Sequence, residues 1–212
     1  SLGEVASGNV ILAFDKWFKE QFMAPGAEWT GESIRNSWED IIYSMNQKIK
    51  EYGASQGVEM GTTITAVLFL KDKYYAIHVG DSRLYELSDG CRQITEDQTL
   101  IARELAQGII TKEQALTDSR RNVLLQCIGV TQKLLPAFYS GNINGEAAYL
   151  VCSDGFRHVI TPDEIYQLCR PLQNLTQKVM QVNLTSLVER VKQRGERDNI
   201  SAVLIQVGRE TC

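Results

Sequence analysis

Two stretches near the start of the chain place apolar residues at every third or fourth position. The first covers Gly3–Phe22 and the second about Glu32–Tyr52, and a loop with Pro25 and Gly26 separates them. This spacing predicts two amphipathic helices, each with one buried stripe. The same period returns over about Leu175–Arg194, which predicts a long helix near the end of the chain.

Between these helices the pattern changes to short apolar, β-branched runs bounded by turn residues, which predicts strands. Thr62–Leu70 and Tyr74–Val79 flank the polar turn at Lys71, so we expect them to form a hairpin. The remaining predicted strands are Arg83–Leu87, Cys91–Ile94, Leu134–Tyr139, Ala147–Cys152 and Ile200–Val207. Helices at both ends with strands mainly between them favour an α+β fold over alternating βαβ units.

Shorter helices are expected in the second half of the chain. One covers about Thr99–Ala106, and another turn lies near Thr111–Ala115 within a polar surface excursion, Gln107–Asn122. The segment Thr161-Pro162-Asp163-Glu164 is typical of a helix start, because a capping hydroxyl precedes proline and two acids of the first turn.

Composition narrows the class of protein. The length of 212 residues fits a single domain, and 22 Lys and Arg against 26 Asp and Glu give a net charge of −4. This balance argues against a nucleic-acid partner. The sequence contains no apolar run of the ~20 residues that span a bilayer and no signal-peptide pattern. Five cysteines without CxxC spacing indicate reduced thiols, so we expect a cytoplasmic protein without a membrane partner.

Three aspartates stand at predicted strand ends and are the candidate chemical groups. Asp81 follows Tyr74–Val79, Asp154 follows Ala147–Cys152, and Asp198 precedes the last strand. If the last two strands pair antiparallel, Asp154 and Asp198 meet at one sheet edge. An aspartate before glycine or asparagine is most often a turn residue, and that alternative applies to each of them.

Two aspartates held close together repel each other unless a cation balances their charge. Mg²⁺ and Mn²⁺ prefer carboxylate and water oxygens, so a divalent cation is the expected cofactor of such a pair. Catalysis by a serine nucleophile is less well supported, because neither Ser82 nor Ser153 lies in a G-x-S-x-G motif. Both are interpreted as turn hydroxyls. His78 is interpreted as structural, while His158, four residues after Asp154, either packs or reaches the same site.

Six short motifs occur in a fixed order, and together they identify a family resemblance. They are Gly61-Thr62-Thr63, the G-D-S-R segment around Asp81, Gln93–Gln98, the Arg120–Leu124 and Ile128-Gly129 stretch, the S-D-G motif at Ser153–Gly155, and the D-N motif at Asp198-Asn199. The sequence resembles the metal-dependent type-2C Ser/Thr protein phosphatases (PPM family), bacterial type. Gln98 stands where this family usually has histidine.

The resemblance implies an α-β-β-α sandwich of two antiparallel sheets flanked by helix pairs, and a single phosphatase-like catalytic domain over residues 1–212. It implies two core Mn²⁺ or Mg²⁺ ions with Asp154 and Asp198 as ligands, and Asp81 as a ligand of a third ion. The implied reaction is hydrolysis of phosphoserine and phosphothreonine monoesters by a metal-bridged water. The implied partners are phosphorylated proteins, substrates of a Ser/Thr kinase, with the Gln107–Asn122 excursion as the flap that shapes substrate access.

The start of the chain departs from the family pattern. Ser1–Ser7 resembles the sequence segment that directly follows the family's D-G-x-G-G motif. We therefore expect that motif and the N-terminal strands to lie outside this chain. This departure motivates an alternative, a catalytically inactive phosphatase-fold module that binds a phosphoprotein or regulator. A further alternative, a phosphatase of a partner-switching antagonist, shares the chemistry and differs only in substrate.

Overall fold

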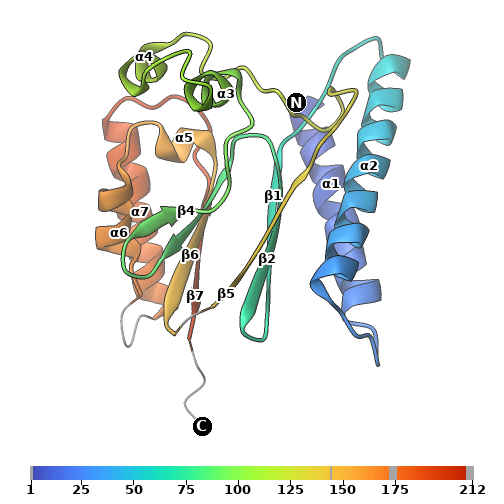
Figure 1. The fold of residues 1–212 in the computed structure, drawn as a ribbon, viewed down its shortest axis with the longest axis horizontal. Coiled ribbons are helices and arrows are strands. Elements are labelled where there is room, and N and C mark those ends of the chain that lie inside the picture. Colours follow the sequence, from blue (N-terminus) through green and yellow to red (C-terminus); the bar gives the residue numbers. More distant parts are fainter. Residues whose placement is uncertain (1, 144, 172–175, 209–212) are drawn as a thin grey trace. The chain divides into compact units, whose positions relative to one another are not determined.

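The computed structural model describes residues 2–143, 145–171 and 176–208 (Figure 1). By their internal contacts these residues form two compact units, and each is described separately. Among the described residues, the first unit comprises 2–70, 75–80 and 97–140. The second comprises 71–74, 81–96, 141–143, 145–171 and 176–208.

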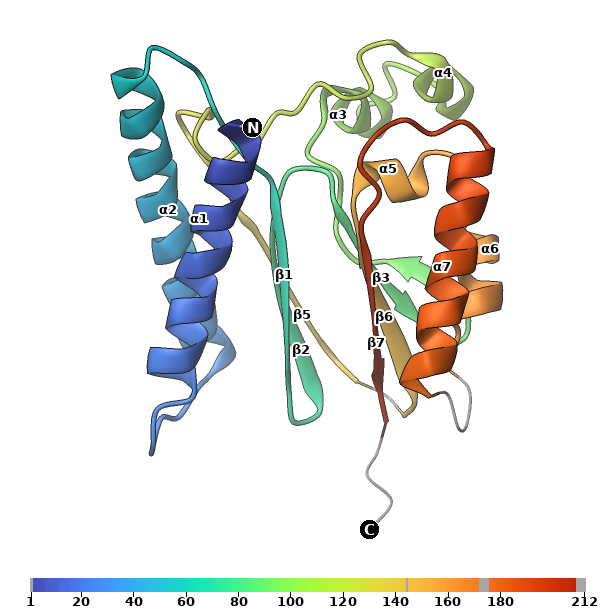
Figure 2. The same ribbon diagram turned by 180° about the vertical axis from the view of Figure 1, so that it is seen from behind.

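The first unit contains two long helices and a sheet with the strand order β1-β2-β5. Its elements are α1 (Leu2–Trp17), the π-helical turn η1 (Phe18–Phe22), α2 (Gly31–Ser55), β1 (Ile64–Leu70), β2 (Lys73–Val79), α3 (Leu100–Ala106), α4 (Lys112–Thr117) and β5 (Ala137–Asn142). Helices α1 and α2 lie side by side and cover one face of this sheet (Figure 2).

Aromatic side chains fill the core between these helices and the sheet. Trp17 and Trp38 are 4% and 2% exposed, and their rings meet edge to face with centroids 5.7 Å apart. The rings of Phe14 and Phe138 also pack against Trp38, with centroid distances of 5.9 and 6.3 Å. Thr30 begins α2 with a capping box, because its side chain accepts from the Ser33 amide and the Ser33 side chain accepts in return. The predicted apolar stripe is buried at Val10 and Trp17 of α1 and at Trp38 of α2. Phe18, which the sequence also places on the stripe of the first helix, is 40% exposed and lies in η1, because the α-helix ends at Trp17.

The second unit contains an antiparallel sheet with the strand order β4-β3-β6-β7. Its elements are β3 (Arg83–Leu87), β4 (Cys91–Gln93), β6 (Ala147–Cys152), the short helix α5 (Asp154–Arg157), α6 (Pro162–Cys169), α7 (Gln177–Gln193) and β7 (Ala202–Val207). Leu150, Phe156, Ile165 and Leu187 are fully or almost fully buried where α5, α6 and α7 pack against the sheet (Figure 1).

Most of the predicted elements are confirmed within a few residues, and the α+β class is confirmed with them. Strand β5 is a correction: the sequence predicts Leu134–Tyr139, whereas the strand covers Ala137–Asn142. Pro136 explains the shift, since proline has no N–H to donate to a strand ladder. Leu134 is apolar because it is buried in the core, 4% exposed, rather than because it lies in a strand.

The helix ends test the capping signals. Thr161 caps α6 with a complete capping box to Glu164, and Pro162 occupies the first helical position, as the sequence predicts. The predicted start of the long helix at Leu175 lies outside the described residues, and the described helix α7 begins at Gln177 after the cap Thr176. Every described helix is too short or too polar to cross a bilayer.

The thiols of the second unit give a test of its packing. Burial raises the pKa of Cys152 to about 12 and that of Cys169 to about 12. Only the thiolate reacts with alkylating reagents, so we expect both thiols to resist iodoacetamide at pH 8 in the folded protein and to react after unfolding. Peptide mass spectrometry after labelling measures this, and rapid native labelling of either cysteine would contradict the packing. Cys91 is half-buried, and the thiol of Cys127 donates to the Thr62 carbonyl at 3.6 Å, whereas Cys212 lies outside the described residues.

Candidate functional site

Strands β6 and β7 bring the ends of two motifs together. The strands pair antiparallel with Cys152 opposite Ala202, so the end of β6 lies beside the start of β7. Ser153 continues this pairing, because its amide donates to the Ser201 carbonyl and its Oγ accepts from the Ser201 amide, both at 3.0 Å. The Ser153 hydroxyl also donates to the Asn199 carbonyl at 3.1 Å. The predicted antiparallel pairing is confirmed, and Ser153 acts as a turn hydroxyl.

Gly155 makes the approach of the two motifs close. A Cβ atom built on Gly155 would lie 2.5 Å from the Asn199 carbonyl oxygen and 3.2 Å from the Asp198 Cβ. Asp154 and Asp198 therefore stand at one edge of the sheet. Each carboxylate accepts from the next amide in the chain, at 2.8 Å for Asp154 and 2.7 Å for Asp198. These local bonds use Oδ1 of each residue and fix the carboxylate orientation.

Asp81 contacts a cationic side chain from α5. Its carbonyl oxygen accepts from Arg157 Nη2 at 3.1 Å, and its Oδ2 lies 3.6 Å from the same nitrogen. Both side chains are 12% exposed. The short helix α5 thus begins with Asp154 and ends with the guanidinium that balances the charge of Asp81. No sequence pattern predicts this role of Arg157, because the contact joins residues 76 positions apart.

His158 and Glu196 form a second polar contact beside the aspartates. His158 Nδ1 lies 3.2 Å from Glu196 Oε2, and its Nε2 lies 3.8 Å from Asp154 Oδ2. The other oxygen of Glu196 accepts from the amides of Arg197 and Asp198, at 2.8 and 2.9 Å. The amide of Asp198 is the largest cause that lowers the pKa of Glu196, and His158 contributes to the same shift. The sequence left His158 open between a packed histidine and one that reaches the site, and it did not single out Glu196.

Gly80, the glycine of the G-D-S-R segment, lies in the first unit and is held by contacts within that unit. Gly80 has φ +117°, and a Cβ there would lie 2.3 Å from the Thr63 Cγ2, so only glycine fits. Gln98 makes two hydrogen bonds with this glycine, both at 2.8 Å. Its side-chain Oε1 accepts from the Gly80 backbone amide, and its own backbone amide donates to the Gly80 carbonyl. His78 is fully buried and its Nε2 lies 2.9 Å from the Gly80 carbonyl, which confirms its structural role.

The Gln107–Asn122 excursion contains α4 and an arginine cluster. Arg120 makes bidentate contacts with Glu104 at 3.1 and 2.9 Å, and it also binds Asp118 at 2.8 Å. These bonds tie the end of the excursion to α3. Ile109 and Leu116 are 64% and 75% exposed. The expectation that this segment shapes substrate access stays a prediction.

The donor chemistry of the aspartate edge suits a hard divalent cation, because carboxylate oxygens are the ligands that Mg²⁺ and Mn²⁺ prefer. Asp154 and Asp198 supply two such groups from neighbouring strand ends. Within residues 2–143, 145–171 and 176–208, no group of three or more His, Cys, Asp or Glu side chains converges as a complete ligand set. The described residues therefore fit part of a metal shell, and the metal-ligand role of Asp81, Asp154 and Asp198 stays a prediction.

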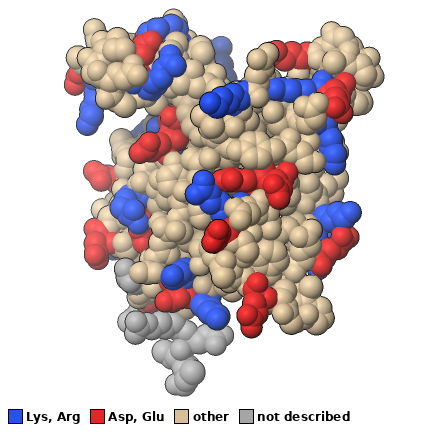
Figure 3. All heavy atoms as spheres, turned by 45° about the vertical axis from the view of Figure 1, so that its right-hand side comes forward, with Lys and Arg blue, Asp and Glu red and all other residues tan. Residues whose placement is uncertain are grey.

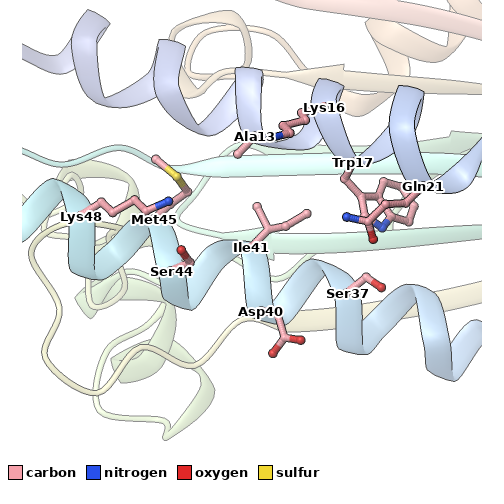
Figure 4. Close-up of a pocket in the computed structure, with 10 residues that line it drawn as sticks. All are labelled: Ala13, Lys16, Trp17, Gln21, Ser37, Asp40, Ile41, Ser44, Met45 and Lys48. Atoms are coloured by element: carbon pink, nitrogen blue, oxygen red, sulfur yellow. The ribbon is translucent and has the colours of Figure 1, made fainter.

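A separate hollow of about 400 Å³ lies between α1 and α2 (Figure 4). The indole of Trp17 and the side chains of Ile41 and Met45 line it, together with the charged groups of Lys16 and Lys48. This mixture is typical of the surface between two amphipathic helices, where lysine stems cover apolar groups. None of the three aspartates lines it, so it is not the candidate site.

The visible surface carries both signs of charge. On the face drawn in Figure 3, lysine and arginine side chains are interspersed with aspartate and glutamate. Opposite charges also pair between α1 and η1, since Lys19 pairs with Asp15 at 2.8 Å and Lys16 lies 3.9 Å from Glu20. The mixed signs on this face agree with the small net charge of −4.

Known proteins resemble the chain along nearly its whole length. The serine/threonine phosphatase stp of Listeria innocua is 29% identical over 207 residues, which are 96% of this chain and 79% of that protein. The phosphatase Stp1 of Staphylococcus aureus superposes with a TM-score of 0.84 at 22% identity, over 96% of this chain and 78% of that one. No known family model matches the chain.

A third similar protein carries metal ions in its solved structure. The catalytic domain of the serine/threonine protein phosphatase PstP, solved with two manganese ions, is 26% identical and superposes with a TM-score of 0.76. The match covers 96% of this chain and 80% of that domain. The likeness confirms the predicted fold class, α+β with two antiparallel sheets and helices.

Proposed function

We propose that the chain belongs to the type-2C (PPM) family of serine/threonine protein phosphatases and that it hydrolyses phosphoserine and phosphothreonine monoesters in proteins. The observation that carries the proposal is the close approach of Gly155 to Asn199 and Asp198, which unites the S-D-G and D-N motifs at one sheet edge. The relatives are named as phosphatases, which supports hydrolysis over the alternative of an inactive binding module.

The family is metal-dependent, and one of its members holds two manganese ions. In this chain Asp154 and Asp198 would hold the core Mn²⁺ or Mg²⁺ ions, and Asp81 would assist with an outer one. A divalent cation in such a site lowers the pKa of bound water and polarises a phosphoryl oxygen. The chain's own contribution is to orient the carboxylates: local amide bonds fix one oxygen of Asp154 and one of Asp198.

The proposed function has consequences for the protein's domain organisation, compartment and partners. We propose that residues 1–212 form a single phosphatase-like catalytic domain that acts in signal transduction in the cytoplasm. Its partners would be phosphorylated proteins, substrates of a Ser/Thr kinase. The five cysteines lack CxxC spacing, a pattern that supports reduced thiols in a reducing compartment.

Removal of divalent metal tests the proposed function. We expect the full gene product to hydrolyse p-nitrophenyl phosphate and a phosphothreonine peptide when Mn²⁺ is present. EDTA should abolish the turnover and excess Mn²⁺ should restore it, because the carboxylates alone supply no cation for the phosphoryl charge. Turnover that resists EDTA would contradict the proposal. Binding of the phosphopeptide without turnover at any metal concentration would favour the inactive module instead.

A further inference from the structure

We propose that Glu196 and His158 are positioning residues that hold the Asp154 and Asp198 carboxylates in register for metal binding. The proposal rests on the proposed function, because it assigns a role to residues beside the predicted metal ligands. Both residues lie outside the S-D-G and D-N motifs. His158 directly follows α5, and Glu196 lies between α7 and β7.

Glu196 shapes the segment that leads into β7. One carboxylate oxygen accepts from two successive amides, those of Arg197 and Asp198, at 2.8 and 2.9 Å. A carboxylate that accepts from backbone amides makes strong, charge-assisted hydrogen bonds. The side chain of Glu196 is only 12% exposed, so little water competes for these donors. Glu196 therefore sets the direction in which the Asp198 backbone enters the site.

His158 joins this segment to α5. Its backbone amide donates to the Asp154 carbonyl at 3.1 Å, which places the imidazole one helical turn after Asp154. The ring is 11% exposed, and its Nδ1 contacts the second oxygen of Glu196 at 3.2 Å. Nε2 lies 3.8 Å from Asp154 Oδ2, beyond hydrogen-bond range, so the ring stands beside this oxygen without a direct hydrogen bond to it.

The two contacts together form a bridge from Asp154 through His158 and Glu196 to the backbone of Asp198. The bridge matters because outer partners orient metal ligands, and their loss typically lowers metal affinity by about 10–100-fold. A purely structural ion pair would instead change the stability of the fold and leave metal affinity in the folded protein unchanged. Metal affinity and fold stability are therefore the readouts that separate the two roles.

The test titrates Mn²⁺ into the full gene product by calorimetry, for the wild type and for Glu196→Ala, Glu196→Gln and His158→Ala. We expect Glu196→Ala and His158→Ala to weaken Mn²⁺ binding by about 10–100-fold. Glu196→Gln should retain most of the affinity, because its amide oxygen still accepts from the two backbone amides. Glu189→Ala is the matched control, since it removes an exposed glutamate of α7 that pairs only locally, with Lys192.

A second readout needs no metal. In the metal-free protein, the Asp198 amide should exchange its hydrogen faster in Glu196→Ala than in the wild type, as measured by NMR, while Glu196→Gln stays close to the wild type. If Glu196→Ala fails to fold, Glu196→Asp replaces it, because the shorter side chain cannot keep both amide bonds and the histidine contact.

The outcomes distinguish this proposal from the proposed function. Wild-type Mn²⁺ affinity and unchanged amide exchange in both alanine variants would overturn the positioning role, even where Asp198→Asn abolishes metal binding. If Asp154→Asn and Asp198→Asn both bind Mn²⁺ as tightly as the wild type, the metal-ligand assignment itself is wrong. Equal loss of affinity in Glu196→Gln and Glu196→Ala would also count against the bridge as described.

Discussion

Replacement of Asp154 by asparagine is expected to lower kcat/KM for phosphomonoester hydrolysis by on the order of 10³-fold. The asparagine oxygen can still accept from the Gly155 amide, which Asp154 Oδ1 does at 2.8 Å, so the local backbone is preserved. The variant loses the negative charge that binds a hard cation and with it the metal's contribution to the transition state. Steady-state kinetics with Mn²⁺ in excess measure this effect, and we expect the same order of loss for Asp198→Asn.

The control for this prediction is Asp89→Asn, which removes a carboxylate from an exposed turn of the same unit. It should leave kcat/KM unchanged. Circular dichroism and thermal unfolding of each variant separate loss of chemistry from loss of fold. Full activity of Asp154→Asn at saturating Mn²⁺ would remove Asp154 from the metal site and the proposed mechanism with it.

The sequence predicted those elements whose stabilisation is local or periodic. Helix α2 was predicted because its apolar stripe has one period throughout, and Ile34, Trp38, Ile42 and Ile49 are buried where that stripe requires. The start of α6 was predicted because Thr161 and Glu164 cap it within four residues. In contrast, β5 was placed three residues early, since apolar side chains before a strand can be buried by tertiary packing without joining the ladder.

The candidate site was predicted to the extent that strand pairing determines it. The sequence placed Asp154 and Asp198 at strand ends that meet if the two strands pair antiparallel, and the structure shows that β6 and β7 do pair in this way. The side chains around them were not predictable in the same way. Arg157 contacts Asp81, and Glu196 contacts His158 across 38 positions of sequence. Such contacts depend on side-chain rotamers and close packing, which the hydrophobic period of the sequence does not determine.

A substitution of Gly155 by alanine should disturb this edge more than any other small change in it. The added methyl group would lie 2.5 Å from the Asn199 carbonyl oxygen, which belongs to the backbone and cannot rotate away. Alanine has a helix propensity about 1 kcal/mol better than glycine. Overpacking typically costs 1–3 kcal/mol, and in this site the added methyl group would force apart the segments that carry Asp154 and Asp198. We therefore expect no stabilisation and a fall in kcat/KM on the order of 10²-fold, since ~1 Å of misplacement suffices for that loss.

Gly90→Ala is the matched control, because a Cβ at Gly90 meets no atom within 4 Å in the same unit. It should leave both the Mn²⁺ affinity and kcat/KM unchanged. Gly155→Ala should weaken Mn²⁺ binding together with turnover, because both require the two carboxylates at their present separation. If Gly155→Ala retained wild-type Mn²⁺ affinity and kcat/KM, the contact between α5 and the segment before β7 would not determine the geometry of the site. Strand pairing alone would then position the two aspartates.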